Sequence, residues 1–243
     1  MTDFAAYTFY VNRPDLLVRS LNAFPDLWPE LTIVDNSPSG IDKVLSRREI
    51  PECIDIYRPP VPFTYTQSLN WMLLDSQDTW RRWSRPSKAD FIIHFHSDAT
   101  TTNPAAVQEL LTYIRAAKAA GKRHGLWWTF YDVLFGINPE AVLSIGGWDP
   151  LFPSYFVDQD LRRRLMLTGW ECVDTHIQGM SHEGSATINS DPKLQFENGR
   201  TFKFQSALYH DRWGGEPGHE VYLAPWNRPD LFGDMKPYGG VSL

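Results

Sequence analysis

The chain has 243 residues, of which 42% are hydrophobic and 21% charged, so it is long enough for one large α/β domain or two small ones with a sizeable core. Its net charge of −6 argues against a nucleic-acid partner, because binding to phosphates needs a basic face. The two cysteines have neither metal-ligand nor redox spacing and no apolar stretch is long enough to cross a bilayer, so we expect a cytoplasmic protein with reduced thiols and no export signal.

In the first half of the chain, apolar runs alternate with segments of helical spacing. Aromatic, β-branched and other apolar residues predict strands at Phe4–Val11, Leu31–Val34, Cys53–Tyr57, Phe91–Phe95 and Gly125–Phe130. Prolines at early helical positions and apolar residues at helical spacing predict helices that begin near Pro14, Thr66, Pro104 and Pro139. This alternation predicts one α/β domain with a mostly parallel central sheet flanked by helices, which binds ligands at the carboxyl ends of its strands.

Two further regions lack that pattern. Beyond Gly169 the periodicity weakens, and the tail from Ser190 onward is rich in Gly, Pro and Trp, so we expect an irregular C-terminal extension. The segment Trp80–Lys88 is locally basic and is either a solvated loop or a contact for an acidic acceptor, a partner or a membrane surface. The ten tryptophans of the chain indicate either a carbohydrate-binding platform or a Trp-rich core.

Three acidic residues stand at expected strand ends or at a helix start, namely Asp35, Asp98 and Asp158. Each of them alone can be a turn residue or a helix cap. In a parallel sheet, however, such positions meet at one edge. Asp35 follows a buried strand, so its carboxylate can accept hydrogen bonds from a nucleobase imide or a ribose. Together the three residues predict a ligand site.

A metal site is indicated by His96 and Asp98, which are one residue apart. In an extended segment their side chains share a face and can reach the same cation. Carboxylate oxygen suits Mg²⁺ or Mn²⁺, and imidazole moves the preference toward Mn²⁺. His182, which has small residues on both sides, can complete this site, contact a phosphate or be a histidine of a surface loop.

The segment Ile145–Gly169 joins a loop rich in Gly, Pro and aromatic residues to a helix start that carries Asp158 and Asp160. A helix start can hold a catalytic base rigidly, and an acid there can equally serve as a cap. The loop suits a flat, hydroxyl-rich ligand. Arg162–Arg164 span nearly a full helical turn, so at most one of these side chains is expected to meet a phosphate.

Other enzyme classes have little support in the sequence. It contains no phosphate-binding loop of the Gly-x-x-x-x-Gly-Lys-Ser/Thr type, no Gly-x-Ser-x-Gly elbow and no His-Glu-x-x-His pair. It also lacks a Gly-rich, basic loop near the N-terminus that would hold a triphosphate, which disfavours a nucleotidyltransferase.

Motifs spread in order over most of the chain resemble those of family-2 glycosyltransferases of the GT-A fold, which use nucleotide sugars and usually invert the anomeric centre. Phe9–Leu17 resembles the first strand and helix of that family, and Ile33–Ser37 is similar to its nucleotide motif. Ser68–Asn70 is similar to the segment whose Asn lies near the nucleotide. His96–Asp98 stands where the family has its Asp-x-Asp metal motif, with His96 in place of the first Asp.

The resemblance continues in the second half of the chain. Ile145–Leu161 is similar to the family's acceptor loop and Glu-Asp-x-Asp-Leu motif, with Val157 in place of the Glu. Ser181–Ser185 resembles the downstream His motif, and Arg212–Gly215 resembles a Lys-Trp-Gly-Gly signature of some members. The second acid of the acceptor-loop motif, here Asp158, is the usual base.

From this resemblance we expect one Rossmann-like GT-A domain over residues 1–243, in which about residues 1–120 bind the nucleotide sugar and about 121–243 bind the acceptor. It implies a divalent cation, Mn²⁺ or Mg²⁺, at Asp98, His96 and His182. The residues implied in donor binding are Asn12, Asp35, Asn36, Asn70 and Ser97. The residues implied near the acceptor or the sugar are Gly147, Trp148, Asp149, Asp160 and Trp213.

The expected activity is transfer of a sugar from a nucleoside-diphosphate sugar to a glycan or other hydroxyl acceptor, with inversion and with Asp158 as general base. Two alternatives stay open. One is a retaining transferase on the same fold, in which Asp158 would not deprotonate the acceptor. The other is a non-catalytic module that binds a nucleotide or a glycan. The sequence does not name the sugar, the base, the acceptor or the oligomeric state.

Overall fold

The structure is a computed structural model that describes residues 3–46, 48–77 and 88–226, except for the side chains of residues 131 and 132. The basic segment Trp80–Lys88 lies outside the described residues apart from Lys88. The chain forms two compact units, Met1–Gln195 and Phe196–Leu243.

The first unit is built on a seven-stranded sheet in the order β3-β2-β1-β4-β7-β6-β8. Its strands are β1 (Phe4–Tyr10), β2 (Leu31–Asp35), β3 (Asp55–Tyr57), β4 (Phe91–Phe95), β6 (His124–Thr129), β7 (Tyr131–Ile137) and β8 (Glu171–Asp174). The first four are parallel neighbours, β6 and β8 are also parallel, and β7 runs antiparallel to both β4 and β6. The sheet is therefore mostly parallel, as the sequence predicts.

Strand β7 is not predicted by the sequence pattern. It follows β6 after the single residue Phe130, and the ladder already pairs Thr129 with Tyr131. Neither Phe130 nor the strand ends beside it are Gly, Pro, Asn or Asp, so the usual turn signal is missing between the two strands. The expected strand at Gly125–Phe130 is in fact the first arm of a hairpin.

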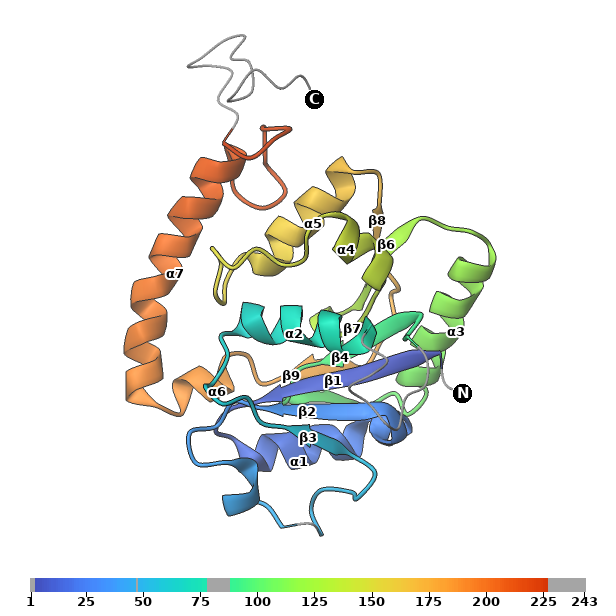
Figure 1. Cartoon of the computed structure of the whole chain (residues 1–243), viewed down its shortest axis with the longest axis vertical. Helices are drawn as coiled ribbons and strands as arrows, with labels where there is room; N and C mark the ends of the chain where they lie inside the picture. The colour runs from blue at the N-terminus through green and yellow to red at the C-terminus, as the bar shows by residue number, and fades with distance from the viewer. Residues whose placement is uncertain (1–2, 47, 78–87, 227–243) are drawn as a thin grey trace. The chain divides into compact units, whose positions relative to one another are not determined.

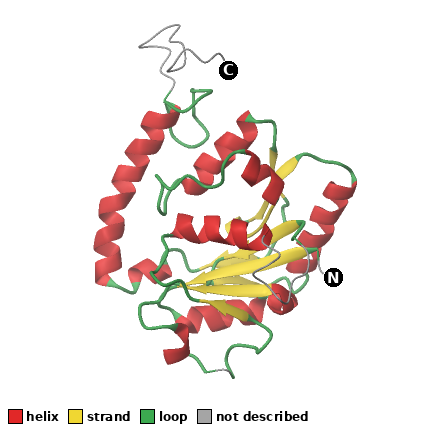
Figure 2. Ribbon diagram, viewed as in Figure 1, coloured by secondary structure: helices red, strands yellow, loops and turns green. Residues whose placement is uncertain are grey.

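Helices cover both faces of the sheet (Figures 1 and 2). The helices of the first unit include α1 (Pro14–Ala23), α2 (Tyr65–Gln77), α3 (Ala106–Ala119), α4 (Pro139–Ser144) and α5 (Val157–Leu167). Because β side chains alternate between faces, Ala6 and Tyr10 of β1 lie in one hydrophobic core with residues of α1 and α3. Tyr7 points to the other face, where its hydroxyl donates to Asp75 of α2 at 2.8 Å. In Figure 1, α1 and α2 accordingly lie on opposite sides of the sheet.

Shorter elements complete the first unit. They are the 3-10 turns η1 (Pro25–Glu30) and η2 (Ile41–Lys43), the strands β5 (Ala99–Thr101) and β9 (Met180–His182), and the short helix α6 (Ala186–Asn189). Strands β5 and β9 form a separate antiparallel ladder in which Ala99 pairs with His182. This ladder brings a segment from late in the chain to the carboxyl end of β4.

Helix α7 (Pro192–Trp213) begins in the first unit and continues in the second, so the expectation of an irregular tail from Ser190 is wrong for these 22 residues. The helix start carries a recognisable signal, since Pro192 follows Asp191, whose carboxylate accepts from the backbone N–H of Lys193 at 2.8 Å. After α7 the second unit continues without regular elements as far as residue 226. Among the helices of the described residues, none combines the length and the apolar character needed to cross a bilayer.

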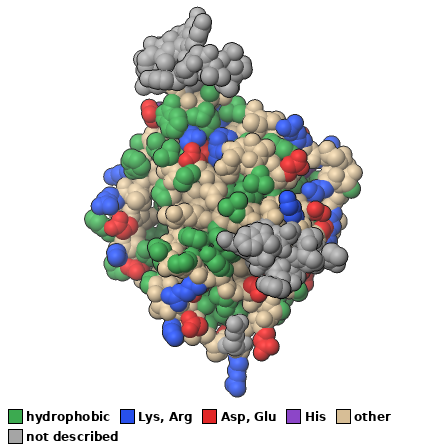
Figure 3. All heavy atoms as spheres, in the orientation of Figure 1, with side chains coloured by type: hydrophobic (Ala, Val, Ile, Leu, Met, Phe, Trp, Pro, Cys, Tyr) green, Lys and Arg blue, Asp and Glu red, His purple; other side chains and the backbone are tan. Residues whose placement is uncertain are grey.

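On the face drawn in Figure 3, the described Lys and Arg side chains are interspersed with Asp and Glu, and neither sign gathers into a patch. This distribution agrees with the modest negative charge of the sequence.

Candidate active site

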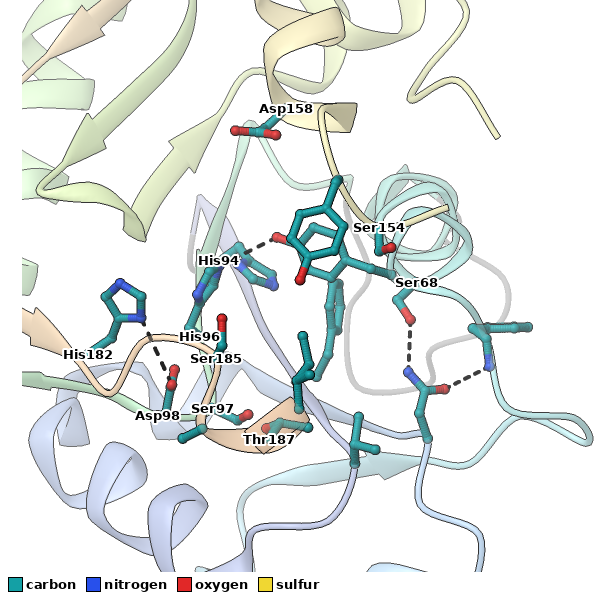
Figure 4. A pocket seen from close by; sticks show the side chains of 18 of the residues that line it. Ser68, His94, His96, Ser97, Asp98, Ser154, Asp158, His182, Ser185 and Thr187 are labelled. Carbon is teal, nitrogen blue, oxygen red and sulfur yellow. Dashed lines mark hydrogen bonds and ion pairs between the residues drawn. The ribbon is translucent and has the colours of Figure 1, made fainter. Parts of the chain in front are cut away.

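A cavity of about 460 Å³ lies where β1, β2 and β4 end. Loops that follow these three parallel strands contribute Val11, Asn36 and the segment His96–Asp98 to its wall. Further wall residues come from β1 and β4, from the region of α2, from α5 and the loop before it, and from β9 and α6 (Figure 4). The cavity thus occupies the edge at which an α/β sheet binds ligands.

His96, Asp98 and His182 converge on one side of this cavity, with their ligand atoms within 4.8 Å of one another. Asp98 Oδ2 and His182 Nδ1 are 3.9 Å apart. The β5–β9 ladder explains the approach, because its register fixes His182 beside Ala99, the residue after Asp98. Two imidazoles and one carboxylate form a donor set that fits a divalent cation and favours Mn²⁺ over Mg²⁺.

The backbone around His96 is held by several contacts. Its N–H donates to the carbonyl of Val133 at 3.0 Å, and its carbonyl accepts from Ala99 N–H at 2.9 Å and from the Ser20 hydroxyl at 3.0 Å. On the cavity side, its Nε2 lies 3.5 Å from the hydroxyl of Tyr65. The tight turn from His96 to Ala99 therefore presents the imidazole and the Asp98 carboxylate in a fixed arrangement.

Asn36 lies in the cavity wall with both ends of its amide engaged. Its Oδ1 accepts from Phe63 N–H at 3.0 Å, and its Nδ2 donates to the Ser68 hydroxyl at 2.9 Å. Ser97 also lines the cavity. Asn36 is therefore hydrogen-bonded to the Phe63 backbone and to the Ser68 side chain, and all three residues line the cavity.

Asp35 is buried at the end of β2 and does not line the cavity. Its carboxylate accepts from the N–H groups of Ser37 at 3.0 Å and Ile41 at 2.8 Å and from the Ser37 hydroxyl, so it closes its own turn. Its charge also acts on Tyr10, its neighbour across the β1–β2 ladder. The pKa of the Tyr10 hydroxyl is raised mainly by burial, and the charge of the Asp35 carboxylate raises it further.

Asn12 and Asn70 also lie behind the wall rather than in it. The amide of Asn12 donates to the carbonyl of Thr187, a wall residue, at 3.2 Å. The amide of Asn70 pairs with the backbone of Trp148, accepting from its N–H at 2.9 Å and donating to its carbonyl at 2.8 Å. Both side chains position segments of the site.

Asp158 is the second residue of α5 and faces the cavity. Two residues before it, Phe156 has a left-handed backbone (φ 60°) and turns the chain into the helix. Gln159 Nε2 donates to its Oδ2 at 3.2 Å. In Figure 4, Asp158 lies across the cavity from His96, Asp98 and His182. The cavity thus has a carboxylate on one side and the cluster of metal-ligand type on the other.

Asp160 points away from this cavity and is fully buried. Its Oδ2 accepts from Arg164 Nε at 2.8 Å, and the same guanidinium donates to the carbonyls of Ile145 and Gly147 at 2.9 Å each. The side chain of Asp160 therefore helps to fix the loop that precedes α5.

The remaining residues expected near an acceptor have different surroundings. Trp148 is 2% exposed and lines a second cavity, which Asp158 also lines. Asp149 accepts from Leu151 N–H at 2.9 Å and shapes the loop. Trp213 ends α7 in the second unit, where its carbonyl accepts from the N–H groups of Val221 and Tyr222 at 3.1 and 3.0 Å.

Solved structures with a similar fold include two glycosyltransferases. A mannosyltransferase from Pyrobaculum calidifontis in complex with GDP-Man and Mn²⁺ matches with a TM-score of 0.53 and 12% identity, over 71% of this chain and 54% of that one. Glucosyl-3-phosphoglycerate synthase from Mycobacterium tuberculosis matches with a TM-score of 0.56 and 12% identity in its complex with Mg²⁺ and UDP, over 80% and 76% of the two chains. The complex of the same synthase with Mn²⁺ and UDP-Glc matches with a TM-score of 0.55 and 13% identity, over 86% of this chain and 78% of that one.

These neighbours are glycosyltransferases, and their folds superpose on most of this chain. The chain has the GT-A glycosyltransferase fold. It spans about half (54%) of the length of the mannosyltransferase. No protein-family model matches the sequence, and a comparison with curated proteins finds no match either. At 12–13% identity the likeness establishes the fold, and the function has to be argued from the site.

Within this GT-A domain, several wall residues are not predicted by the sequence motifs. Tyr65 begins α2, one residue before the expected helix start, and lines both cavities. The segments Ser154–Phe156 and Ser185–Ile188 also line the larger cavity. Ser154–Phe156 lies inside the acceptor-loop motif, and its two aromatic residues are the sequence feature that could have indicated a role in the wall. The second lies beyond Gly169, where the periodic pattern is weak.

Proposed function

We propose that the chain transfers a sugar from a nucleoside-diphosphate sugar to a hydroxyl acceptor with inversion of the anomeric centre. The observation that carries this proposal is the placement of the Asp158 carboxylate across one cavity from the His96, Asp98 and His182 cluster. A base on one side and a cation site on the other meet the needs of a reaction that deprotonates a nucleophile and releases a diphosphate.

The donor would lie in the larger cavity, with its nucleoside along the wall formed by Asn36, Phe63 and Ser68. The neighbouring mannosyltransferase and synthase, which were solved with GDP-Man or UDP-Glc, support this class of donor. His96, Asp98 and His182 would hold a divalent cation, which neutralises the negative charge that grows on the diphosphate. Mn²⁺ in complexes of both neighbours supports the same assignment.

In the transfer step, the acceptor oxygen forms a bond to the anomeric carbon while the bond from that carbon to the diphosphate oxygen breaks. The electron pair leaves with the diphosphate, and the Asp158 carboxylate takes the proton of the acceptor hydroxyl. Asp158 suits this role because it borders both cavities, so an acceptor in the smaller one could present its hydroxyl to a donor in the larger one. Its position at a helix start limits its movement.

Titration of the full chain with UDP and GDP in the presence of Mn²⁺, followed by turnover assays with UDP-Glc and GDP-Man and a panel of hydroxyl acceptors, tests the proposal. We expect one nucleotide to bind and its sugar to be transferred, with the opposite anomeric configuration in the product by proton NMR. Retained configuration would contradict the inverting mechanism. Nucleotide binding without turnover of any donor would identify a binding module instead.

A further inference from the structure

A second cavity, of about 320 Å³, adjoins the first one and lies between β6, β8 and α5. Asp158 and Tyr65 belong to the walls of both cavities. Most of the remaining wall is apolar, with Leu69, Trp148 and Phe135 among its residues. A volume of this size holds a compound about as large as a monosaccharide.

The only arginine in this wall, among the described residues, is Arg162, which lies four residues after Asp158. Residues four apart share one face of a helix and are separated by about 6 Å along its axis. Both side chains therefore belong to the same side of α5 and border the same cavity. The proposed base and a permanent positive charge are about one helical turn apart.

The guanidinium of Arg162 is stacked on Trp128 of β6, with its central carbon 3.8 Å from the ring centroid. Its Nε is buried, and within residues 3–46, 48–77 and 88–226 the group has no hydrogen-bond or ion-pair partner. Stacking fixes the plane of the guanidinium while its N–H groups stay available at the edges. Arg164, two residues later, differs, since its guanidinium donates to Asp160 and to the loop carbonyls.

We propose that the acceptor carries an anionic group, a carboxylate or a phosphate, which Arg162 binds while Asp158 receives the proton of the reacting hydroxyl. This inference rests on the proposed function and names the class of its acceptor. A planar guanidinium presents paired donors that match either anion. Arg162 also covers one face of the Trp128 ring, so that face does not serve as a stacking platform for a neutral sugar.

Three ring compounds of similar size test the inference, namely glucose, glucuronate and glucose 6-phosphate. Each is titrated by calorimetry into the full chain saturated with Mn²⁺ and whichever of UDP and GDP binds. We expect at least one of the two anions to bind about tenfold more tightly than glucose, as a charged hydrogen bond implies. The anion that is preferred distinguishes a carboxylate acceptor from a phosphate acceptor.

The variant R162Q should remove the difference between anionic and neutral compounds, and R162K should keep part of it. The matched control is R123Q, since Arg123 also lies over a tryptophan, Trp170, at 4.7 Å but lines neither cavity. It should leave the preference unchanged. Unaltered nucleotide affinity in each variant shows that the domain is folded.

The inference is overturned if glucose binds as tightly as both anions, if none of the three binds at about 10 mM, or if R162Q keeps the preference. Should R162Q fail to fold, the inference is still tested by the affinities of the wild type for glucose and the two anions, and by the partial preference expected of R162K. Failure of UDP and GDP to bind at all contradicts the proposed function itself, so the two failures are distinguishable.

Discussion

Asp160 and Arg164 form a buried ion pair on α5, two and six residues after Asp158, the residue proposed as base. Arg164 Nε lies 2.8 Å from Asp160 Oδ2, and the two side chains are 14% and 0% exposed. The remaining guanidinium donors hold the carbonyls of Ile145 and Gly147. One arginine therefore joins the start of α5 to the loop before it, and the orientation of Asp158 depends on that connection.

Arg164→Met should lower the free energy of unfolding by about 3–5 kcal/mol, because it leaves the Asp160 carboxylate buried without its partner. Urea unfolding followed by circular dichroism measures this loss. Arg200→Met is the control, since Arg200 is largely exposed and pairs with Glu197 at 3.3 Å. An exposed pair of this kind contributes less than about 1 kcal/mol to stability. Equal stability of the two variants would contradict the role given to the buried pair.

Gly147→Ala should destabilise the domain more than Gly146→Ala. Both glycines have positive φ, at +82° and +83°, so the alanine strain of about 1–2 kcal/mol is common to both. Only at Gly147 would the new Cβ lie 2.6 Å from Asn70 Oδ1, which also accepts from Trp148. The difference between the two unfolding midpoints isolates this collision, and a difference of zero would show that the Asn70 contact is dispensable.

Asp158→Asn should reduce turnover by about 10²- to 10⁴-fold, because an amide cannot accept the proton of the acceptor hydroxyl. Nucleotide affinity should change little, since the carboxylate lies across the cavity from the cation cluster. Turnover and calorimetric affinity are measured on the same preparation, with Asp26→Asn as the matched control, since Asp26 lines neither cavity. Near-normal turnover of Asp158→Asn would remove this residue from the mechanism.

The cluster of His96, Asp98 and His182 should bind Mn²⁺ more tightly than Mg²⁺, because imidazole nitrogen suits the softer ion. His96→Asp should narrow this preference, and Asp98→Asn should weaken binding of both ions. Electron paramagnetic resonance of free Mn²⁺ gives the affinities without any activity measurement, and competition gives those for Mg²⁺. His210→Ala, which removes an exposed histidine of α7, should have no effect. If the ratio of Mn²⁺ affinity to Mg²⁺ affinity is the same in His96→Asp as in the wild type, His96 is not a ligand.

How much of the molecule the sequence predicts depends on the range of the interactions involved. The strand ends, the α5 start and the pairing of His96 with Asp98 depend on local patterns and are found from them. From the sequence, completing the metal site is one of several alternatives for His182, because the register that places this residue pairs Ala99 with His182, 83 positions later in the chain. The bonds of Arg164 to the loop carbonyls and the stacking of Arg162 on Trp128 are also long-range, and three consecutive arginines carry no local signal of their separate roles.

For Asn70 and Asp35, the sequence indicates a functional role, but it does not indicate which groups their side chains contact. Their sequence segments resemble motifs of family-2 glycosyltransferases, but neither residue lines the larger cavity. Their side chains, however, are engaged with Trp148 and with the turn after β2. Polar side chains that are buried must find partners, and which partner they find is decided by the tertiary structure.

Cys172 should react with a thiol reagent only at high pH, whereas Cys53 should react readily because it is exposed. Burial in β8 raises the pKa of the Cys172 thiol to about 11, an effect that the charge of Arg162 only partly offsets. At pH 8 about one thiol in a thousand is then ionised, and only the thiolate attacks. In Cys53→Ser, the alkylation rate should therefore rise about tenfold per pH unit from pH 8 toward pH 10. Fast alkylation of Cys172 at pH 8 would show that its strand opens or that its thiol is not shielded. Since Arg162 is the charge that lowers this pKa, Arg162→Gln should slow the reaction further, which links the thiol to the proposed anion-binding residue.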